Sequence, residues 1–134
     1  MSVIFHSYSE DDTRRVASTL AKNAKAGDTF CLHGELGAGK TTFAQGFIGG
    51  HVTSPTFVLM NEYERGDVRV YHFDLYRITE DDLEGIGFTD CLSSGVCLIE
   101  WAERAGGQIP DGAARVRIRA DAAKGDSYRE ITVS

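Results

Sequence analysis

Gly34-Glu35-Leu36-Gly37-Ala38-Gly39-Lys40-Thr41-Thr42 is the stretch of this sequence that decides the fold. It fits the pattern Gly-x-x-x-x-Gly-Lys-[Ser/Thr], which describes a loop whose backbone amides surround a phosphate chain. The apolar and β-branched run at residues 29–33 predicts a buried strand before the loop. Residues 41–48 can form a helix with apolar side chains on one side. The pattern therefore predicts a strand, a phosphate-binding loop and a helix in succession.

Each residue type in this stretch suits one part of phosphate binding. A loop that turns its amides inward needs backbone conformations that a Cβ atom obstructs, which favours glycine at positions 34, 37 and 39. Lys40 adds a positive charge for the β- and γ-phosphates, and the Thr41 hydroxyl is a hard oxygen ligand of the kind that Mg²⁺ prefers. We expect the phosphate contacts to come from Glu35, Gly37, Ala38, Gly39, Lys40, Thr41 and Thr42.

Length and composition indicate one globular domain. The chain has 134 residues, of which 42% are hydrophobic, and we expect residues 1–134 to form a single domain. No apolar run approaches the roughly 18 residues of a membrane span, and the N-terminus lacks a basic region followed by an apolar stretch. We therefore expect a cytoplasmic protein without membrane contact.

The cysteines and the net charge exclude some classes of function. Cys31, Cys91 and Cys97 are odd in number and show no Cys-x-x-Cys spacing, so we expect reduced core residues and no metal or redox role. The net charge is −6, and no cluster of basic residues is longer than Arg14-Arg15. This charge argues against strong independent binding to a nucleic-acid backbone, so any nucleic acid should be met through a partner.

The remaining chain predicts helices and strands on both sides of the phosphate loop. Ser9 and the acids after it are typical of a helix start, and two pairs of β-rich runs separated by short polar turns are typical of hairpins. The fold class is thus an α/β P-loop domain with a mixed central sheet, flanking helices and antiparallel hairpins. The predicted strands cover residues 3–5, 29–33, 57–64, 68–73, 96–99, 115–119 and 128–133, and the predicted helices begin at 10, 41 and 80 and end near 25, 48 and 84.

Two acids follow apolar strands and could serve a nucleotide site. A nucleotide hydrolase of this class needs an acid at the carboxyl end of a core strand, where it holds the Mg²⁺ shell or orients the attacking water. Asp74 follows the run 68–73, and Glu100 follows the run 96–99. The pattern places Glu100 at the end of the more deeply buried strand, but by itself it does not decide which acid binds the metal.

Four motifs in order resemble the TsaE (YjeE) family. They are the phosphate loop at 34–42, Ser-Pro-Thr-Phe at 54–57, His-Phe-Asp-Leu-Tyr-Arg at 72–77 and Glu-Trp-Ala-Glu at 100–103. That family comprises small bacterial ATPases of tRNA threonylcarbamoyladenosine biosynthesis. The resemblance covers essentially the whole chain and is far more specific than the phosphate loop alone.

The resemblance implies a set of roles for a bound ATP and Mg²⁺. Thr41 and Glu100 would hold the metal, and Asp74 would orient water or support the metal from outside its ligand shell. Thr56 falls where a switch loop would report on the γ-phosphate, although an ordinary turn threonine also fits Ser54-Pro55-Thr56. Glu10 and Arg129 lie where the family approaches the adenine.

The resemblance also names a partner. It implies that the chain acts with the heterodimer that transfers the threonylcarbamoyl group to tRNA (TsaB-TsaD-like), and that tRNA is met only through this complex. The chain itself shows no basic tract that would grip RNA unaided. Such a partner would also stimulate an ATPase that is slow alone.

Other classes of nucleotide protein remain as alternatives. A small-molecule kinase shares the phosphate loop and the Mg²⁺ chemistry, but it usually carries a lid with arginines, and the sequence shows no such insertion. A GTPase would carry an Asn-Lys-x-Asp element, which is absent. Three further residues keep two interpretations each: Trp101 as a nucleotide or partner contact or as core, Arg77 as a charge stabiliser or a surface ion pair, and His72 as a structural histidine or a base.

Overall fold

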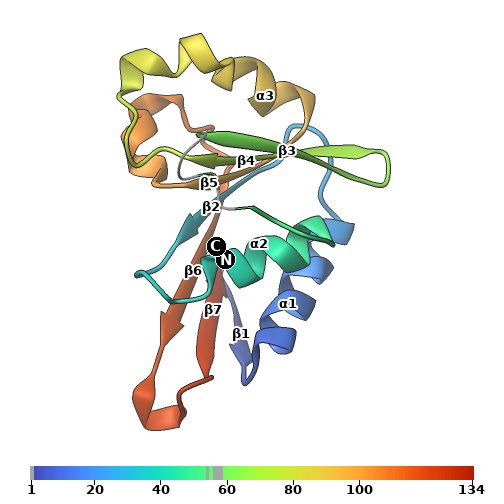
Figure 1. Ribbon diagram of the computed structural model, residues 1–134, viewed down its shortest axis with the longest axis vertical. Helices are drawn as coiled ribbons and strands as arrows, with labels where there is room; N and C mark the ends of the chain where they lie inside the picture. The colour runs from blue at the N-terminus through green and yellow to red at the C-terminus, as the bar shows by residue number, and fades with distance from the viewer. Residues whose placement is uncertain (1, 54, 56–58) are drawn as a thin grey trace. The chain divides into compact units, whose positions relative to one another are not determined.

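The computed structural model describes residues 2–53, 55 and 59–134, and its strands belong to a mixed seven-stranded sheet (Figure 1). By its internal contacts the chain forms two compact units. The first comprises Met1–Asn23, Leu32–Val52 and Arg115–Ser134, and the second comprises Ala24–Cys31 and Thr53–Ala114. Strand β2, Thr29–His33, contributes residues to both units. The prediction of one domain over the whole chain stays a prediction.

The first unit contains the phosphate loop, two helices and an antiparallel group of strands. β1 pairs with β7, and β7 pairs with β6, both in antiparallel register. β1 ends the strand order, as predicted for an edge strand. The elements are β1 Val3–Ser7, α1 Glu10–Lys22, α2 Lys40–Ile48, β6 Ala114–Ala120 and β7 Arg129–Val133, with a 3₁₀ turn, η5, at Ala122–Lys124.

The C-terminal hairpin of this unit has one buried and one exposed face. On β6, Val116 and Ile118 are buried, whereas Arg117 and Arg119 between and beside them are exposed. Ile131 on β7 is the register partner of Ile118 and is also fully buried. Successive side chains of a strand point to opposite faces, so the alternation of arginine and aliphatic residues produces this arrangement. The predicted hairpin with one face to solvent is confirmed.

Helices α1 and α2 pack closely against each other, and a glycine permits the approach. A Cβ atom on Gly46 would lie 2.4 Å from both the Cα and the carbonyl oxygen of Arg14. Phe43 and Phe47 of α2 are almost fully buried, with ring centroids 6.2 Å apart. Ser9 caps α1, because its hydroxyl accepts a hydrogen bond of 3.1 Å from the Asp12 amide.

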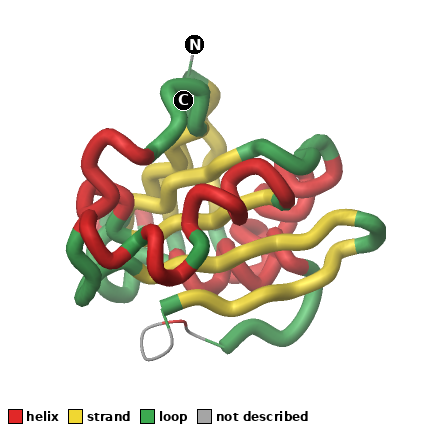
Figure 2. Tube along the Cα trace, turned by 90° about the horizontal axis from the view of Figure 1, so that it is seen from above, coloured by secondary structure: helices red, strands yellow, loops and turns green. Residues whose placement is uncertain are grey.

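The second unit contains the β3–β4 hairpin, the strand β5 and several short helical segments (Figure 2). β3 and β4 are antiparallel, as the sequence predicted for this hairpin, and β4 and β5 are parallel. The first predicted strand of the hairpin begins on residues outside the described part of the chain. The elements are β3 Met60–Arg65, β4 Val68–Asp74, α3 Phe88–Ser94 and β5 Val96–Glu100, with 3₁₀ turns η2 Glu80–Asp82, η3 Glu84–Ile86 and η4 Ala102–Gln108.

The two faces of β4 and β5 carry different chemistry. Tyr71 and Phe73 on β4 join Cys97 and Ile99 on β5 in a buried apolar cluster that also contains Phe88 of α3. The strands pair in register, so the alternate residues share the opposite face. Those residues are His72, Asp74, Leu98 and Glu100. Val96–Ile99 is buried throughout, as predicted for a central strand.

Two helical predictions need correction. The first helix ends at Lys22, earlier than the predicted end near Lys25, because the Asn23 amide bonds to the Leu20 carbonyl at 3.3 Å and closes the last turn. The region predicted as one short helix at 80–84 forms two 3₁₀ turns, and α3 follows them. α3 has only seven residues and begins after Gly87, so its periodicity was too short to recognise. No described helix is long and apolar enough to cross a membrane.

Candidate functional site: a nucleotide pocket and an acidic strand end

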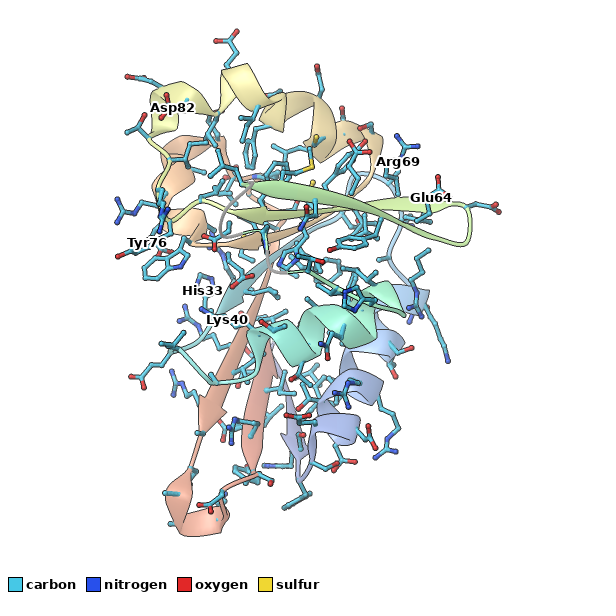
Figure 3. All side chains as sticks on the ribbon, viewed as in Figure 1. His33, Lys40, Glu64, Arg69, Tyr76 and Asp82 are labelled. Atoms are coloured by element: carbon cyan, nitrogen blue, oxygen red, sulfur yellow. The ribbon has the colours of Figure 1, made fainter. Side chains whose placement is uncertain are left out.

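The phosphate loop joins the end of β2 to the start of α2, between His33 and Lys40 (Figure 3). Gly37 and Gly39 have φ values of 81° and 117°, in the left-handed region that side chains rarely adopt. Gly34 is required for a different reason, because a Cβ atom there would lie 2.9 Å from the Ile118 carbonyl oxygen. Two glycines therefore give the loop its curvature, and the third lets β6 approach it.

The start of α2 has the character of an anion-binding end. The first helical hydrogen bond runs from the Phe43 amide to the Gly39 carbonyl at 2.9 Å, so the amides before Phe43 precede the helical ladder. Lys40 opens the helix and is partly buried, whereas the Thr41 side chain is exposed. Backbone amides and the helix dipole both favour a phosphate at this position.

A cavity of about 200 Å³ lies beside the loop and gathers residues from three parts of the first unit. The predicted site residues Glu10 and Arg129 both line it, although they come from opposite ends of the sequence. Sequence reasoning missed the polar residues around them, because no motif marks these positions. The lining residues are Ser9, Glu10 and Thr13 of the α1 region, Gly37, Ala38, Gly39 and Thr42 of the loop region, and Asp126, Ser127 and Arg129 of the hairpin.

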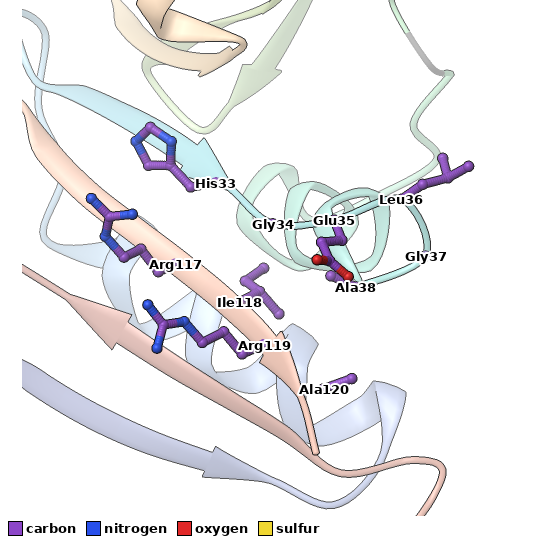
Figure 4. Close-up of a pocket in the computed structure, with 10 residues that line it drawn as sticks. All are labelled: His33, Gly34, Glu35, Leu36, Gly37, Ala38, Arg117, Ile118, Arg119 and Ala120. Carbon is purple, nitrogen blue, oxygen red and sulfur yellow. The ribbon is translucent and has the colours of Figure 1, made fainter. Parts of the chain in front are cut away.

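A larger cavity of about 510 Å³ lies along another side of the loop. Figure 4 shows Glu35 on this side, together with Arg117 and Arg119 of β6. His33 also lines it, and the Arg115 guanidinium lies 3.4 Å from the His33 Nε2 atom. Glu35 was predicted to contact the phosphates as part of the loop, whereas Glu10 was predicted to lie near the adenine. The structure places Glu35 along the larger cavity and Glu10 along the smaller one.

The two predicted acids, Asp74 and Glu100, are register partners at the carboxyl ends of parallel strands. One Asp74 carboxylate oxygen accepts a hydrogen bond of 3.0 Å from the Tyr76 amide, which orients this buried side chain. Glu100 is held by His72, whose Nε2 atom lies 2.8 Å from the Glu100 carboxylate. His72 is only 1% exposed, and no hydrogen-bond partner is present for its Nδ1 atom in the described part of the chain. These contacts favour the structural interpretation of His72.

Trp101 follows Glu100 in an unusual conformation. Its φ and ψ of 60° and 44° are left-handed, which is uncommon for a bulky residue and costs on the order of 1 kcal/mol or more. The residue is 39% exposed, and its ring centroid lies 4.8 Å from that of Tyr76. Arg104 lies over the Tyr76 ring at 5.7 Å. Trp101 is therefore not a core residue, and it forms an exposed aromatic pair beside the acids.

The remaining predictions of chemistry concern the cysteines and Thr56. All three cysteines are free and buried, as expected. Burial raises the pKa of the Cys97 thiol to about 12, so it stays protonated at neutral pH.

Within the described ranges, no group of three His, Cys, Asp or Glu residues could hold a metal ion. Thr56 lies outside the described residues, as do Ser54 and Phe57 of its motif.

The glycine loop lies between a strand and a helix, in an α/β fold with a mixed sheet. This arrangement defines the P-loop nucleoside triphosphatase fold. The family model described as "Threonylcarbamoyl adenosine biosynthesis protein TsaE" matches residues 7–131, and the chain belongs to this family. A relative named "tRNA threonylcarbamoyladenosine biosynthesis protein TsaE" from Bacillus subtilis is 41% identical over 128 residues, covering 91% of this chain and 78% of the relative.

Two further comparisons agree with this family. The protein of the same name from Treponema pallidum is 37% identical over 135 residues, which cover 96% of this chain and 97% of the relative. The crystal structure of YdiB from Bacillus subtilis matches with a TM-score of 0.78 and 36% identity, covering 99% of this chain and 84% of that one. The resemblance found in the four motifs is confirmed, and with it a role in tRNA threonylcarbamoyladenosine biosynthesis.

Proposed function

We propose that this chain binds and hydrolyses ATP as a component of tRNA N6-threonylcarbamoyladenosine formation. The observation that carries the proposal is the phosphate loop, in which left-handed Gly37 and Gly39 lead directly into the first turn of α2. A loop of this shape suits the phosphate chain of a nucleotide. The cytoplasmic location expected from the sequence belongs to the same proposal.

The cavity beside the loop fits part of the nucleotide. Pockets that enclose a whole small-molecule ligand usually measure about 300–1,000 Å³. The cavity that Glu10 and Arg129 line measures about 200 Å³, which suits the base or the ribose while the phosphates occupy the loop. Lys40 would offset the charge that develops on the β- and γ-phosphates when the terminal bond breaks.

The donor chemistry of the predicted metal ligands fits Mg²⁺. A threonine hydroxyl and a carboxylate are hard oxygen ligands, and one Glu100 oxygen is already oriented by His72. Thr41 and Glu100 would hold the ion, which would neutralise charge on the phosphates. Asp74, fixed by the Tyr76 amide, is then the acid that would orient the attacking water. Thr56 remains our proposal for the residue that reports on the γ-phosphate.

The partner in this proposal is the heterodimer that transfers the threonylcarbamoyl group. A family named for this tRNA modification supports it, and so does the net charge of −6, which disfavours unaided RNA binding. A loop that orders around a γ-phosphate and relaxes after hydrolysis can couple nucleotide state to a docking surface. Hydrolysis by the isolated chain should therefore be slow, and ATP should favour the complex over ADP.

The test measures ATP hydrolysis and association with and without the purified heterodimer. We expect a slow basal rate, an increase when the heterodimer is added, and tighter association with ATP than with ADP. Candidate small-molecule acceptors are added in a parallel arm, with GTP as the nucleotide control. Brisk hydrolysis that the heterodimer leaves unchanged, with phosphate transfer to an acceptor, would instead identify a small-molecule kinase.

A further inference from the structure

One guanidinium joins the phosphate loop to the C-terminal hairpin within the first unit. Arg129 donates from Nε to the Ala38 carbonyl at 2.7 Å and from a terminal nitrogen to the Gly37 carbonyl at 3.3 Å. Its other terminal nitrogen donates to the carbonyls of Asp126 and Tyr128 at 2.9 and 2.7 Å. Four backbone carbonyls, two from each segment, are thereby held by one planar group.

We propose that Arg129 is a positioning residue that holds the phosphate loop in its anion-binding shape, and that it does not serve as a contact to the adenine. The inference rests on the proposed ATP site, because it assigns a role within that site. It replaces the expectation that Arg129 approaches the base, and it leaves Glu10 and the other residues that line the 200 Å³ cavity as the candidate contacts to the base or ribose.

Peptide planarity explains how a bond to a carbonyl orients an amide. The Gly37 carbonyl shares a trans peptide plane with the Ala38 amide, and the Ala38 carbonyl shares one with the Gly39 amide, so carbonyl and N–H point in opposite directions. The Ala38 amide donates to the Glu35 carbonyl at 2.9 Å, which closes the turn of the loop. The Gly39 amide therefore points away from the guanidinium. In this orientation it can donate to a phosphate oxygen held in the loop.

The hairpin holds Arg129 in a fixed position beside the phosphate loop. Tyr128, the neighbour of Arg129, is only 2% exposed, and its hydroxyl lies 2.6 Å from the His6 Nδ1 atom of β1. The Lys124 ammonium lies 5.0 Å from the centre of the same ring. Because Tyr128 is anchored in this way, the sheet fixes the backbone position of the adjacent Arg129.

The hydrogen-bond inventory argues against a base contact. A guanidinium has five N–H donors in a fixed plane, and four of the Arg129 donors are directed at backbone carbonyls. A lysine would keep the charge, but its three N–H donors sit on one nitrogen and cannot reproduce the planar fork that spans both segments. Arg129→Lys therefore separates loop positioning from simple attraction of the phosphates.

The first experiment compares the affinities of ATP and inorganic tripolyphosphate for the wild type and Arg129→Lys. Tripolyphosphate carries the phosphate chain without a base. We expect both affinities to fall about tenfold, because the loop loses several hydrogen bonds. The matched control is Arg69→Lys on β4, where the half-exposed guanidinium pairs with Glu62 and Glu64 and lines neither cavity beside the loop. This variant should bind both ligands as the wild type does. A variant that loses ATP affinity but keeps tripolyphosphate affinity would assign Arg129 to the base and overturn the proposal.

Amide hydrogen exchange of the nucleotide-free protein provides a readout that does not depend on ATP. We expect faster exchange across residues 34–40 in Arg129→Lys and in a second variant, Arg129→Gln, with the exchange of α1 unchanged. Unchanged exchange in the loop would also overturn the proposal that Arg129 holds the loop in shape. If the wild type binds neither ligand, the proposed ATP site fails, whereas the exchange result still decides whether Arg129 holds the loop.

Discussion

Individual residues of the phosphate loop act through either their backbone or their side chain. The glycines act through the conformations they permit, so their substitution would change the shape of the loop. Lys40 differs, since its contribution is a charge at the start of α2. We therefore expect a change at Lys40 to remove an electrostatic interaction without altering the left-handed conformations of Gly37 and Gly39.

Lys40→Ala should abolish ATP hydrolysis. The variant lacks the charge that offsets the phosphates in the transition state, and turnover should fall by at least ~100-fold, the scale of one lost electrostatic stabiliser. Steady-state phosphate release measures the effect, with the exposed Lys25→Ala as the control. A Lys40→Ala rate within a few-fold of wild type would show that the loop is not the hydrolytic site.

Glu100→Gln and Asp74→Asn should separate metal binding from water orientation. Replacing a metal-binding carboxylate by an amide removes charge at the ion, so Glu100→Gln should weaken Mg²⁺-dependent ADP binding more than Asp74→Asn does. Asp74→Asn should mainly slow hydrolysis, because a water-orienting acid acts in the transition state. Titrations of ADP with and without Mg²⁺ decide between the two acids. The reverse ranking would exchange their roles.

At the scale of elements, the approach of α1 to α2 depends on the absence of a side chain at Gly46. Alanine is the better helix former by about 1 kcal/mol, so propensity alone predicts that Gly46→Ala stabilises α2. The backbone of Arg14 stands 2.4 Å from the position of the added Cβ, which leaves no flexible group to move aside. The close packing of α1 against α2 therefore opposes the gain in helix propensity that alanine would bring to α2.

We expect Gly46→Ala to lower the free energy of unfolding by about 1–3 kcal/mol, the usual cost of overpacking. The thermal midpoint should fall by several degrees. Gly50→Ala is the matched control, because no atom lies within 4 Å of an added Cβ there. A Gly46→Ala midpoint equal to or above that of the wild type would mean that the helices separate at little cost.

For the molecule as a whole, nucleotide binding should raise the free energy of unfolding. Any ligand that binds only the folded chain stabilises it by mass action, and ATP at ~100 times its dissociation constant contributes ~2.7 kcal/mol. Saturating Mg-ATP should therefore raise the thermal midpoint by several degrees in a chain of 134 residues. Thermal melts with ATP, with GTP and without nucleotide measure the shift. A midpoint indifferent to Mg-ATP would contradict the ATP site.

The sequence by itself determined the parts of the fold that local patterns encode. The phosphate loop was predictable because glycine spacing and a lysine report backbone conformation and charge directly. β2 matches its predicted range of 29–33, and the alternation of β6 predicted which residues would face solvent. Such features depend on residues only a few positions apart, so their pattern can be recognised directly in the sequence.

Only the tertiary structure decided which distant residues meet. It placed Glu10 and Arg129 along one cavity and Glu35 along another. It also paired His72 with Glu100 and directed Arg129 to the loop carbonyls. Strand pairing and register set these contacts, and register is fixed by how the buried faces pack, not by the local sequence of either strand. The sequence therefore proposed the residues of the site, and only the structure showed which residues they contact.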